Sequence, residues 1–343
     1  MTWRLDDKRS GCGIAKLLCT RILACAVGAG LAGCSGPQSG LDPAGRGAEQ
    51  IADLFWWMVA GSVVVWLAVV WLTYSAIRGR ASKHTERQAR LYVIGGGALI
   101  PTVVLAALLI YGLGMMPELV APAPPGTLKI RVIGEQWWWR IRYEPAEGEP
   151  VELANEIRLP VGQPVEFELE SPDVIHSFWI PPLGGKMDMI PGRTTRLLLH
   201  PTRTGTFRGA CAEYCGTSHA LMAFDVVVSE EAEFNGWLEQ QRRPVAESSE
   251  SIVNAGRELF FLNGCAACHS IRGTEARGVV GPDLTHVGSR LSIGAGIVPN
   301  GPEGFRRWIA QTDKVKPDVR MPHFGMLPPE ELESLSAYLE SLQ

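Results

Sequence analysis

The sequence predicts a multidomain membrane protein with a two-helix transmembrane hairpin, a β-sandwich and an all-α C-terminal domain. Three observations indicate this architecture. Two long apolar stretches lie between residues 51 and 116, short segments that alternate apolar and polar residues occupy residues 126–229, and helical periodicity begins at residue 251. At 343 residues the chain is long enough for two globular domains besides the membrane segments.

The two apolar stretches, residues 51–77 and 91–116, each exceed the roughly 20 residues that cross a bilayer. The loop between them, RGRASKHTERQAR, carries five basic residues and one acid. The positive-inside rule places such a loop in the cytoplasm, so both ends of the hairpin face outward. We therefore expect two spans, with both globular domains on the outer, periplasmic face of a bacterial inner membrane.

The N-terminus is typical of an export signal, because a basic start precedes the apolar run ILACAVGAGLAG and Cys34. The ending LAGC resembles the bacterial lipobox, which implies cleavage before Cys34 and a lipid on its sulfur. The alternative is a short signal anchor with an incidental cysteine. We interpret residues 1–33 as a lipoprotein-type signal peptide and residues 34–120 as an N-terminal segment followed by the transmembrane hairpin.

The exported part, residues 117–343, contains 21 Lys and Arg residues against 30 Asp and Glu residues, a net charge of −9. This balance argues against a nucleic-acid partner and favours a basic protein partner, because surface charge steers encounters. A surface kept soluble by its negative charge is the alternative.

The exported part divides into two domains. Residues 121–241 form the predicted sandwich, with strands expected at 127–135, 138–144, 155–160, 164–170, 174–180, 194–200, 205–212 and 223–228, and with a helix at 229–241. The polar, proline-bearing segment 242–250 is interpreted as a linker. Residues 251–343 form the helical domain, with helices expected at 251–264, 304–312 and 328–342.

The exported cysteines after Cys34 form two closely spaced pairs, each inside a ligand-like motif. Disulfides are the usual use of cysteine in exported proteins and remain an alternative. The first pair lies in CAEYCGTSHALM, whose candidate ligands are Cys211, Cys215, His219 and Met222. Soft sulfur suits copper and imidazole suits copper or zinc, whereas a structural zinc site does not normally include methionine. A second histidine is needed, and His176 lies on an apolar strand.

The second pair lies in NGCAACHSIRG, a C-x-x-C-H motif typical of covalent haem attachment. Cys265 and Cys268 would form the thioether bonds, and His269 would be an axial ligand. A zinc or redox C-x-x-C site is the alternative. The motif resembles c-type cytochromes, which implies a second axial ligand; the setting RMPHFG favours Met321, and Met326 is interpreted as a packing residue. The resemblance also implies that Pro282, in GPDL, accepts a hydrogen bond from His269. His200, His286 and His323 are interpreted as surface or turn histidines.

The motif C-x-E-x-C-x3-H-x2-M, preceded by DVIHSFWIP and GEQWWW, resembles subunit II of the haem–copper cytochrome c oxidases over roughly residues 50–240. The resemblance implies a cupredoxin-like sandwich with a binuclear CuA centre of two copper ions. In this family two cysteines bridge the metals, two histidines each cap one metal, a methionine is a weak axial ligand, and a glutamate carbonyl completes the set: Cys211, Cys215, His176, His219, Met222 and Glu213. The Glu213 side chain is also implied as a ligand of a magnesium ion at the contact with subunit I.

The aromatic run Trp137, Trp138 and Trp139 has two interpretations. Tryptophan near a membrane commonly serves core packing or an interfacial belt. In the family that the chain resembles, the first aromatic residue lies at the docking surface and passes electrons toward copper. We expect that role for Trp137 and a packing role for the other two. Glu135 stands where the family usually has histidine.

A subunit II with a C-terminal cytochrome c domain resembles the caa3-type oxidases. The resemblance implies the subunit at which electrons enter a terminal oxidase, passing from a donor through haem c and CuA to subunit I, where oxygen is reduced to water. The implied partners are subunits I and III, and the implied donor is a c-type cytochrome or a quinol–cytochrome c reductase. Two alternatives are the CuA subunit of another respiratory reductase, such as a nitric oxide reductase, and a membrane-tethered electron carrier or copper-storage module.

Overall fold

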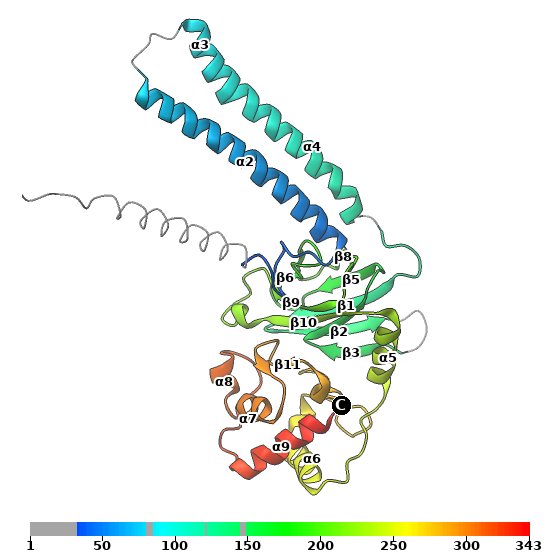
Figure 1. Cartoon of the computed structure of the whole chain (residues 1–343). Helices are drawn as coiled ribbons and strands as arrows, with labels where there is room; N and C mark the ends of the chain where they lie inside the picture. The colour runs from blue at the N-terminus through cyan, green and yellow to red at the C-terminus, as the bar shows by residue number, and fades with distance from the viewer. Residues whose placement is uncertain (1–32, 80–84, 121, 145–148) are drawn as a thin grey trace, which may run out of the picture.

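The computed structural model describes residues 33–79, 85–120, 122–144 and 149–343. Figure 1 shows three parts in a row: a long helical hairpin, a β-sandwich and a helical C-terminal domain, with the sandwich between the other two. The predicted fold class is confirmed. The predicted signal peptide, apart from residue 33, lies outside the described residues, and the domain boundaries remain predictions.

The hairpin consists of α2 (Arg46–Arg78) and a second long helix formed by α3 (Glu86–Arg90), the π-helical η1 (Leu91–Leu99) and α4 (Ile100–Val120). Both long helices are apolar enough to cross a membrane, and no residue of their most apolar windows is buried inside the protein. A helix that is apolar on all sides and is not covered by protein is typical of a membrane span.

The first turns of α2 rest on the sandwich, which fixes how the hairpin leaves the globular part (Figure 1). Ala44, Ala48 and Ala52 are buried there. The backbone N–H of Ala44 donates to Pro182 O at 2.7 Å, and that of Arg46 donates to His200 O at 3.0 Å. Small side chains allow this close approach of helix and sheet.

The sandwich has two five-stranded sheets, ordered β3-β2-β1-β5-β8 and β4-β10-β9-β6-β7. The pairs β1–β5 and β4–β10 are parallel, and the other pairs are antiparallel. The strands are β1 (Leu128–Glu135), β2 (Trp138–Glu144), β3 (Val151–Ala154), β4 (Glu156–Pro160), β5 (Val165–Glu170), β6 (His176–Trp179), β7 (Met187–Met189), β8 (Thr195–Leu199), β9 (Gly205–Cys211) and β10 (Ala223–Ser229). The eight predicted strands are confirmed, and β3 and β7 were not predicted.

Aromatic side chains fill the space between the sheets. Phe178 and Phe224 stack with ring centroids 4.9 Å apart, and Trp139 packs edge-on against both, at 5.8 and 5.1 Å. All three side chains are wholly buried. Such rings contribute large apolar area, so this end of the sandwich is rigid. The predicted packing role of Trp139 is confirmed.

The helices of the C-terminal part are α5 (Glu231–Arg242), α6 (Ser251–Leu262), α7 (Pro302–Ala310), α8 (Thr312–Val315) and α9 (Pro329–Ser341), with a short ladder of β11 (Ser292–Ile293) and β12 (Val298–Pro299). The short 3-10 turns are η3 (Cys265–Ala267) and η4 (Val287–Ser289). α6 packs against α9 through Phe260 and Tyr338, whose ring centroids lie 5.7 Å apart. The predicted helices are confirmed; α8 and the ladder were not predicted.

The C-terminal domain lies directly against the sandwich. The Arg140 guanidinium donates to Val279 O at 2.9 Å, and the Leu291 N–H donates to the Glu156 carboxylate at 2.7 Å. Ala223, the first residue of β10, donates its N–H to Ala295 O at 3.1 Å. The two domains therefore share a polar, hydrogen-bonded interface.

His286 was predicted to be a surface or turn histidine, and it lies in a turn that is buried. Its side chain is only 2% exposed, and its Nε2 lies 3.0 Å from Arg243 O, in the segment that joins the two domains. Burial lowers the pKa of His286. Sequence alone gave no motif around this residue, because its partner lies 43 positions away.

Candidate metal centre and cofactor cavity

One loop between β9 and β10 carries most of the candidate ligands. Cys211 is the last residue of β9, His219 begins the 3-10 turn η2 (His219–Leu221), and Met222 follows directly. The Cys211 N–H donates to Met222 O at 2.9 Å, so the two ends of the loop are hydrogen-bonded to each other. The loop is therefore closed at its two ends, and the side chains of its candidate ligands converge on one site.

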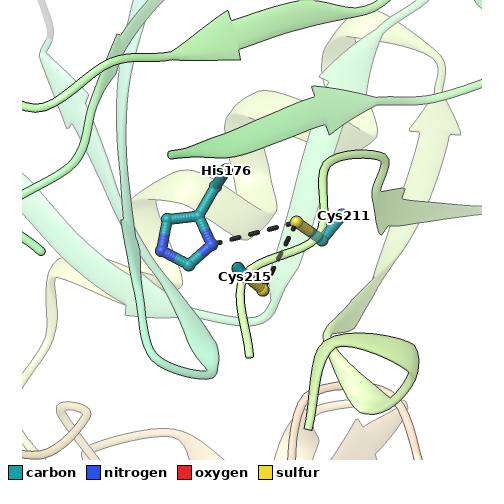
Figure 2. A group of neighbouring side chains, drawn as sticks. All are labelled: His176, Cys211 and Cys215. Atoms are coloured by element: carbon teal, nitrogen blue, oxygen red, sulfur yellow. Dashed lines mark hydrogen bonds between the residues drawn. The ribbon is translucent and has the colours of Figure 1, made fainter. Parts of the chain in front are cut away.

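The sixth candidate comes from a neighbouring strand. His176 begins β6, and its neighbour Phe178 pairs with Cys211 across the β6–β9 ladder. Residues two apart in a strand share a face, so His176 lies on the face that also carries Cys211. Figure 2 shows the side chains of His176, Cys211 and Cys215 pointing toward one another.

The donor atoms lie close together. Cys211 Sγ and Cys215 Sγ are 3.8 Å apart, His176 Nδ1 is 3.8 Å from Cys211 Sγ, and His219 Nδ1 is 3.5 Å from Cys215 Sγ. Met222 Sδ lies 3.8 Å from Cys215 Sγ, and Glu213 O lies 3.2 Å from Cys211 Sγ. A disulfide needs about 2.05 Å between sulfurs, so the two thiols are not bonded to each other. The structure brings all six predicted ligands together.

A carboxylate outside the predicted set orients the His176 ring. His176 Nε2 lies 2.9 Å from Asp173 Oδ1, while Asp173 Oδ2 accepts the Gln136 N–H at 2.8 Å. With its proton on Nε2, the imidazole turns the lone pair of Nδ1 toward Cys211. Such a carboxylate–histidine pair is the usual support of a metal-binding imidazole.

The electrostatics of this group favour a bound cation. Burial raises the pKa of Asp173, but hydrogen bonds from His176, Gln136 and Val174 lower it more, to about 2. Burial lowers the pKa of His176, and Asp173 and Cys211 raise it above its ordinary value. Hydrogen bonding with Cys215 lowers the pKa of Cys211, and that thiolate in turn raises the pKa of Cys215. Both thiols can ionise together only when a metal neutralises them.

The chemistry of the donor set fits copper. Two thiols, a thioether, two imidazoles and one carbonyl are predominantly soft or borderline ligands. Cys215 and Met222 are 3% and 1% exposed, so the group is shielded from water. Among the described residues, His176, Cys211 and Cys215 are the only cluster of three or more His, Cys, Asp or Glu ligand atoms within 4.8 Å of one another. Glu213 belongs to no such cluster, so magnesium binding stays a prediction.

Close backbone approach makes room for the site. A Cβ at Gly134, in β1, would lie 3.1 Å from the His176 ring carbons. Glycine at this position therefore lets the imidazole lie flat against the strand.

Gln136 and Trp137 lie between β1 and β2 and contact the loop of residues 211–222, which we call the copper loop. The Trp137 indole donates to Cys215 O at 3.0 Å, and the Gln136 amide donates to the same oxygen at 2.7 Å. Trp137 was expected on a docking surface, but its side chain is only 7% exposed, because it lies at the boundary with the C-terminal domain. Trp138 packs under the Arg140 guanidinium, 4.7 Å from its ring centroid, and Glu135 accepts from the same arginine.

A cavity of about 300 Å³ lies at the same boundary. Side chains from both domains line it, among them Trp137, Trp138, Cys265, Cys268, His269 and Met321. The C-x-x-C-H motif therefore opens into a space that the sandwich helps to close. Its predominantly apolar wall fits a haem, with the two cysteines at the edge of the cavity.

His269, the candidate axial ligand of the haem motif, is hydrogen-bonded to the turn that contains Pro282, as the sequence predicted. His269 Nδ1 lies 2.8 Å from Pro282 O, which leaves Nε2 available as a ligand. Burial lowers the pKa of His269, which keeps the imidazole neutral and able to bind metal. A Cβ at Gly281 would lie 2.6 Å from the His269 ring, so glycine is required beside it.

Of the two candidate axial methionines, only Met321 lines the cavity. Met326 was expected to pack, and this is wrong, because its side chain is 71% exposed. His323 is exposed, as predicted, and His200, which directly follows β8, is partly exposed.

We expect Met321→Ala to abolish the sulfur-to-iron charge-transfer band of the haem, because the thioether is the only cavity-lining methionine among the described residues. Met326→Ala serves as the matched control and should retain the full band. Visible absorption spectra of the two oxidised variants make this comparison. A band that survives in Met321→Ala and disappears in Met326→Ala would reverse the assignment.

Sequence reasoning missed Asp173, Gln136, Ser218 and Lys316, all of which contact the loop or its ligands. Asp173 lies three residues before His176, and that short spacing was the one available signal. The other three act through contacts that span 79 residues or more, so nothing in their local sequence marks them.

Comparison with known proteins agrees with this geometry. The family profile "Cytochrome C oxidase subunit II, periplasmic domain" matches residues 144–230, and the profile "Cytochrome c" matches residues 253–343. The cytochrome c oxidase subunit 2 of Alkalihalophilus pseudofirmus is 35% identical over 326 residues, which are 91% of this chain and 94% of the relative. That of Bacillus subtilis is 30% identical over 339 residues, with the same coverage.

Among solved structures, the periplasmic domain of subunit II of cytochrome oxidase from Bradyrhizobium japonicum is 33% identical, with a TM-score of 0.33. It covers 35% of this chain, and the match spans 97% of that domain. Because sequence similarity extends over nine-tenths of the chain and includes both exported domains, the protein belongs to the cytochrome c oxidase subunit 2 family.

Proposed function

We propose that electrons from an external donor enter this chain at a covalently attached haem c, pass to a binuclear CuA centre, and leave to subunit I. The chain is the electron-accepting subunit of a respiratory haem–copper oxidase, and oxygen is reduced in another subunit. The proposal adds the order of the two centres and the residues that hold them. When bound, copper and haem supply the one-electron chemistry, which no side chain could supply alone.

One observation carries the order of transfer: Trp137 belongs to both sites. Its side chain lines the cavity beside the C-x-x-C-H motif, and its indole donates a 3.0 Å hydrogen bond to Cys215 O. An electron that leaves the cavity through this wall reaches the candidate copper ligands without crossing solvent. We infer that Trp137 is the contact through which the two centres exchange electrons.

The roles of the ligand residues follow from their positions. Cys211, Cys215, His176, His219, Met222 and the Glu213 carbonyl would hold the two coppers, which would accept and release one electron. The rigid aromatic core beneath β6 and β9 keeps these groups in place, so little geometry changes when the electron arrives. Asp173 holds the His176 ring, and the pair Gln136 and Trp137 holds Cys215.

In the C-terminal domain, Cys265 and Cys268 would attach the haem, and His269 and Met321 would bind its iron. The hydrogen bond between His269 and Pro282 O supports this assignment. We further propose that Cys34 carries a lipid and that both domains lie on the periplasmic side of the membrane. Subunit III is proposed as a second partner. The Glu213 side chain is proposed to bind magnesium at the contact with subunit I.

The donor is proposed to be a basic c-type cytochrome or a quinol–cytochrome c reductase, because the exported part carries a net charge of −9. The alternatives of a nitric oxide reductase subunit and of a free electron carrier are less favoured, since the relatives from Alkalihalophilus pseudofirmus and Bacillus subtilis, each matched over 94% of its length, are cytochrome c oxidase subunits.

We expect the chain purified from membranes to bring subunit I with it and to support oxygen uptake with a basic cytochrome c. Uptake should fall as salt is added, because about 0.1 M salt screens charge attraction beyond about 10 Å. An uncharged small-molecule reductant is the control and should show no such dependence. A chain that purifies alone, or one that reduces nitric oxide and not oxygen, would contradict the proposal.

A further inference from the structure

A buried lysine lies where the copper loop meets the C-terminal domain. Lys316 follows α8 and is only 2% exposed. Its ammonium donates to Leu221 O at 2.7 Å and to Gly294 O at 3.0 Å. Leu221 precedes Met222 in the copper loop, and Gly294 belongs to the C-terminal domain. The Lys316 side chain therefore links the copper loop to the C-terminal domain, next to the candidate ligand Met222.

A second contact lies beside the first. Ser218 Oγ donates to Pro317 O at 2.6 Å, and the Ser218 side chain is wholly buried. Ser218 directly precedes His219 in the chain, and Leu221 lies two positions after His219. The adjacent residues Lys316 and Pro317 thus hold the loop on both sides of a candidate copper ligand.

The same segment leads to the haem side. Lys316, Val319, Arg320 and Met321 all line the cavity of the C-terminal domain. The proposed axial methionine, Met321, lies five positions after Lys316. One short segment therefore carries both the proposed axial methionine and the two residues that are hydrogen-bonded to the copper loop.

Lys316 is a charged residue in a buried position, and this requires a physical explanation. In the described part of the chain, Lys316 forms no ion pair with a carboxylate, so only carbonyl oxygens compensate its charge. Burial lowers the pKa of Lys316 to about 7, while attraction to Cys215 raises it. A buried charge is weak evidence of a purely stabilising role, because hydrophobic side chains of similar volume often stabilise a buried site as well as charged ones do. The charge therefore points to a role at the metal.

We propose that Lys316 is a positioning residue that holds the His219–Met222 loop against the haem domain and whose positive charge favours arrival of the electron at the copper centre. This inference rests on the proposed function. A nearby cation stabilises the form of the centre that carries one more negative charge.

The test compares Lys316→Met with Lys314→Met in the full-length chain. Methionine keeps the length of the side chain and removes the ammonium, and Lys314 is an exposed lysine two positions away. Rapid reduction of the haem is followed by recording copper absorption. In Lys316→Met the equilibrium should shift at least tenfold toward the haem, because tenfold is the effect of one charge about 12 Å away at an effective dielectric constant of about 20, and a closer charge has a larger effect. Redox titration should give a lower CuA potential, and Lys314→Met should match the wild type.

Amine acylation of the metal-free wild-type chain, read by mass spectrometry, tests the contact without any cofactor. Lys316 should be protected and Lys314 should react. Equal labelling of the two lysines would overturn the inference even if Lys316→Met failed to fold. An unchanged equilibrium and potential in a folded variant would overturn it while leaving the proposed function intact. Absence of haem-to-copper transfer in the wild type would instead contradict the proposed function, and the labelling would still decide whether Lys316 is enclosed.

Discussion

Replacing Cys215 with serine is expected to abolish the visible absorption of the CuA centre and to leave the haem spectrum intact. Cys215 Sγ lies within 3.8 Å of three other candidate donors, Cys211 Sγ, His219 Nδ1 and Met222 Sδ, so its removal affects the whole group. A hydroxyl is a much harder and less acidic ligand than a thiol, and it cannot bridge two coppers in the same way. The change is nearly isosteric, so the sandwich should still fold.

The matched control is Cys268→Ser in the haem motif, which should weaken covalent haem attachment and retain the copper bands. Metal analysis and absorption spectra of both purified variants make the comparison. Copper bands that persist in Cys215→Ser would exclude the bridging role. Loss of haem from that variant would show that the two sites do not assemble independently.

Truncation after Arg243 is expected to cut oxygen uptake with the natural donor by about tenfold to a thousandfold, the range over which changes to a docking surface alter association rates. All six copper ligands, α5 and both membrane helices precede the cut. The copper centre should therefore still assemble. Trp137, which the C-terminal domain helps to enclose, would then face solvent and could accept electrons directly, but more slowly.

Steady-state oxygen uptake by intact and truncated enzyme across a salt series makes the measurement, with the copper spectrum as the control for folding. The buried interface supplies a further check, because truncation also removes Lys316 from Leu221 O. The truncated form should show a lower CuA potential, in the same direction as Lys316→Met. Equal uptake by both forms at every salt concentration would mean that the haem domain takes no part in electron delivery.

Much of the fold and of the two candidate sites could be predicted from the sequence, because most of the candidate ligands lie in short motifs. Cys211, Glu213, Cys215, His219 and Met222 lie within twelve positions, so one loop brings them together whatever surrounds it. Cys265, Cys268 and His269 are similarly local. The membrane helices were predicted because continuous apolar runs of sufficient length have few other uses. Strands β3 and β7 were missed because they have only four and three residues, too few for an alternating pattern.

The predictions that were wrong concern exposure. Met326 was expected to pack and is exposed, and His286 lies in a turn, as one of its two predicted alternatives has it, but that turn is buried and not at the surface. A single methionine or histidine carries no periodic signal, so its burial depends on which elements lie over it. Trp137 is the same case, since its enclosure depends on the C-terminal domain.

By itself, the sequence determined the fold class, the two candidate metal centres and nearly all of their ligands, because these depend on local spacing and on continuous patterns. Only the tertiary structure decided how the centres face each other. It placed Trp137 between the cavity and Cys215 O, turned Asp173 toward His176, and enclosed Lys316 between Leu221 O and Gly294 O. The contacts of Trp137 and Lys316 join residues 22 to 95 positions apart, and such contacts depend on how the folded domains pack, which no local pattern encodes.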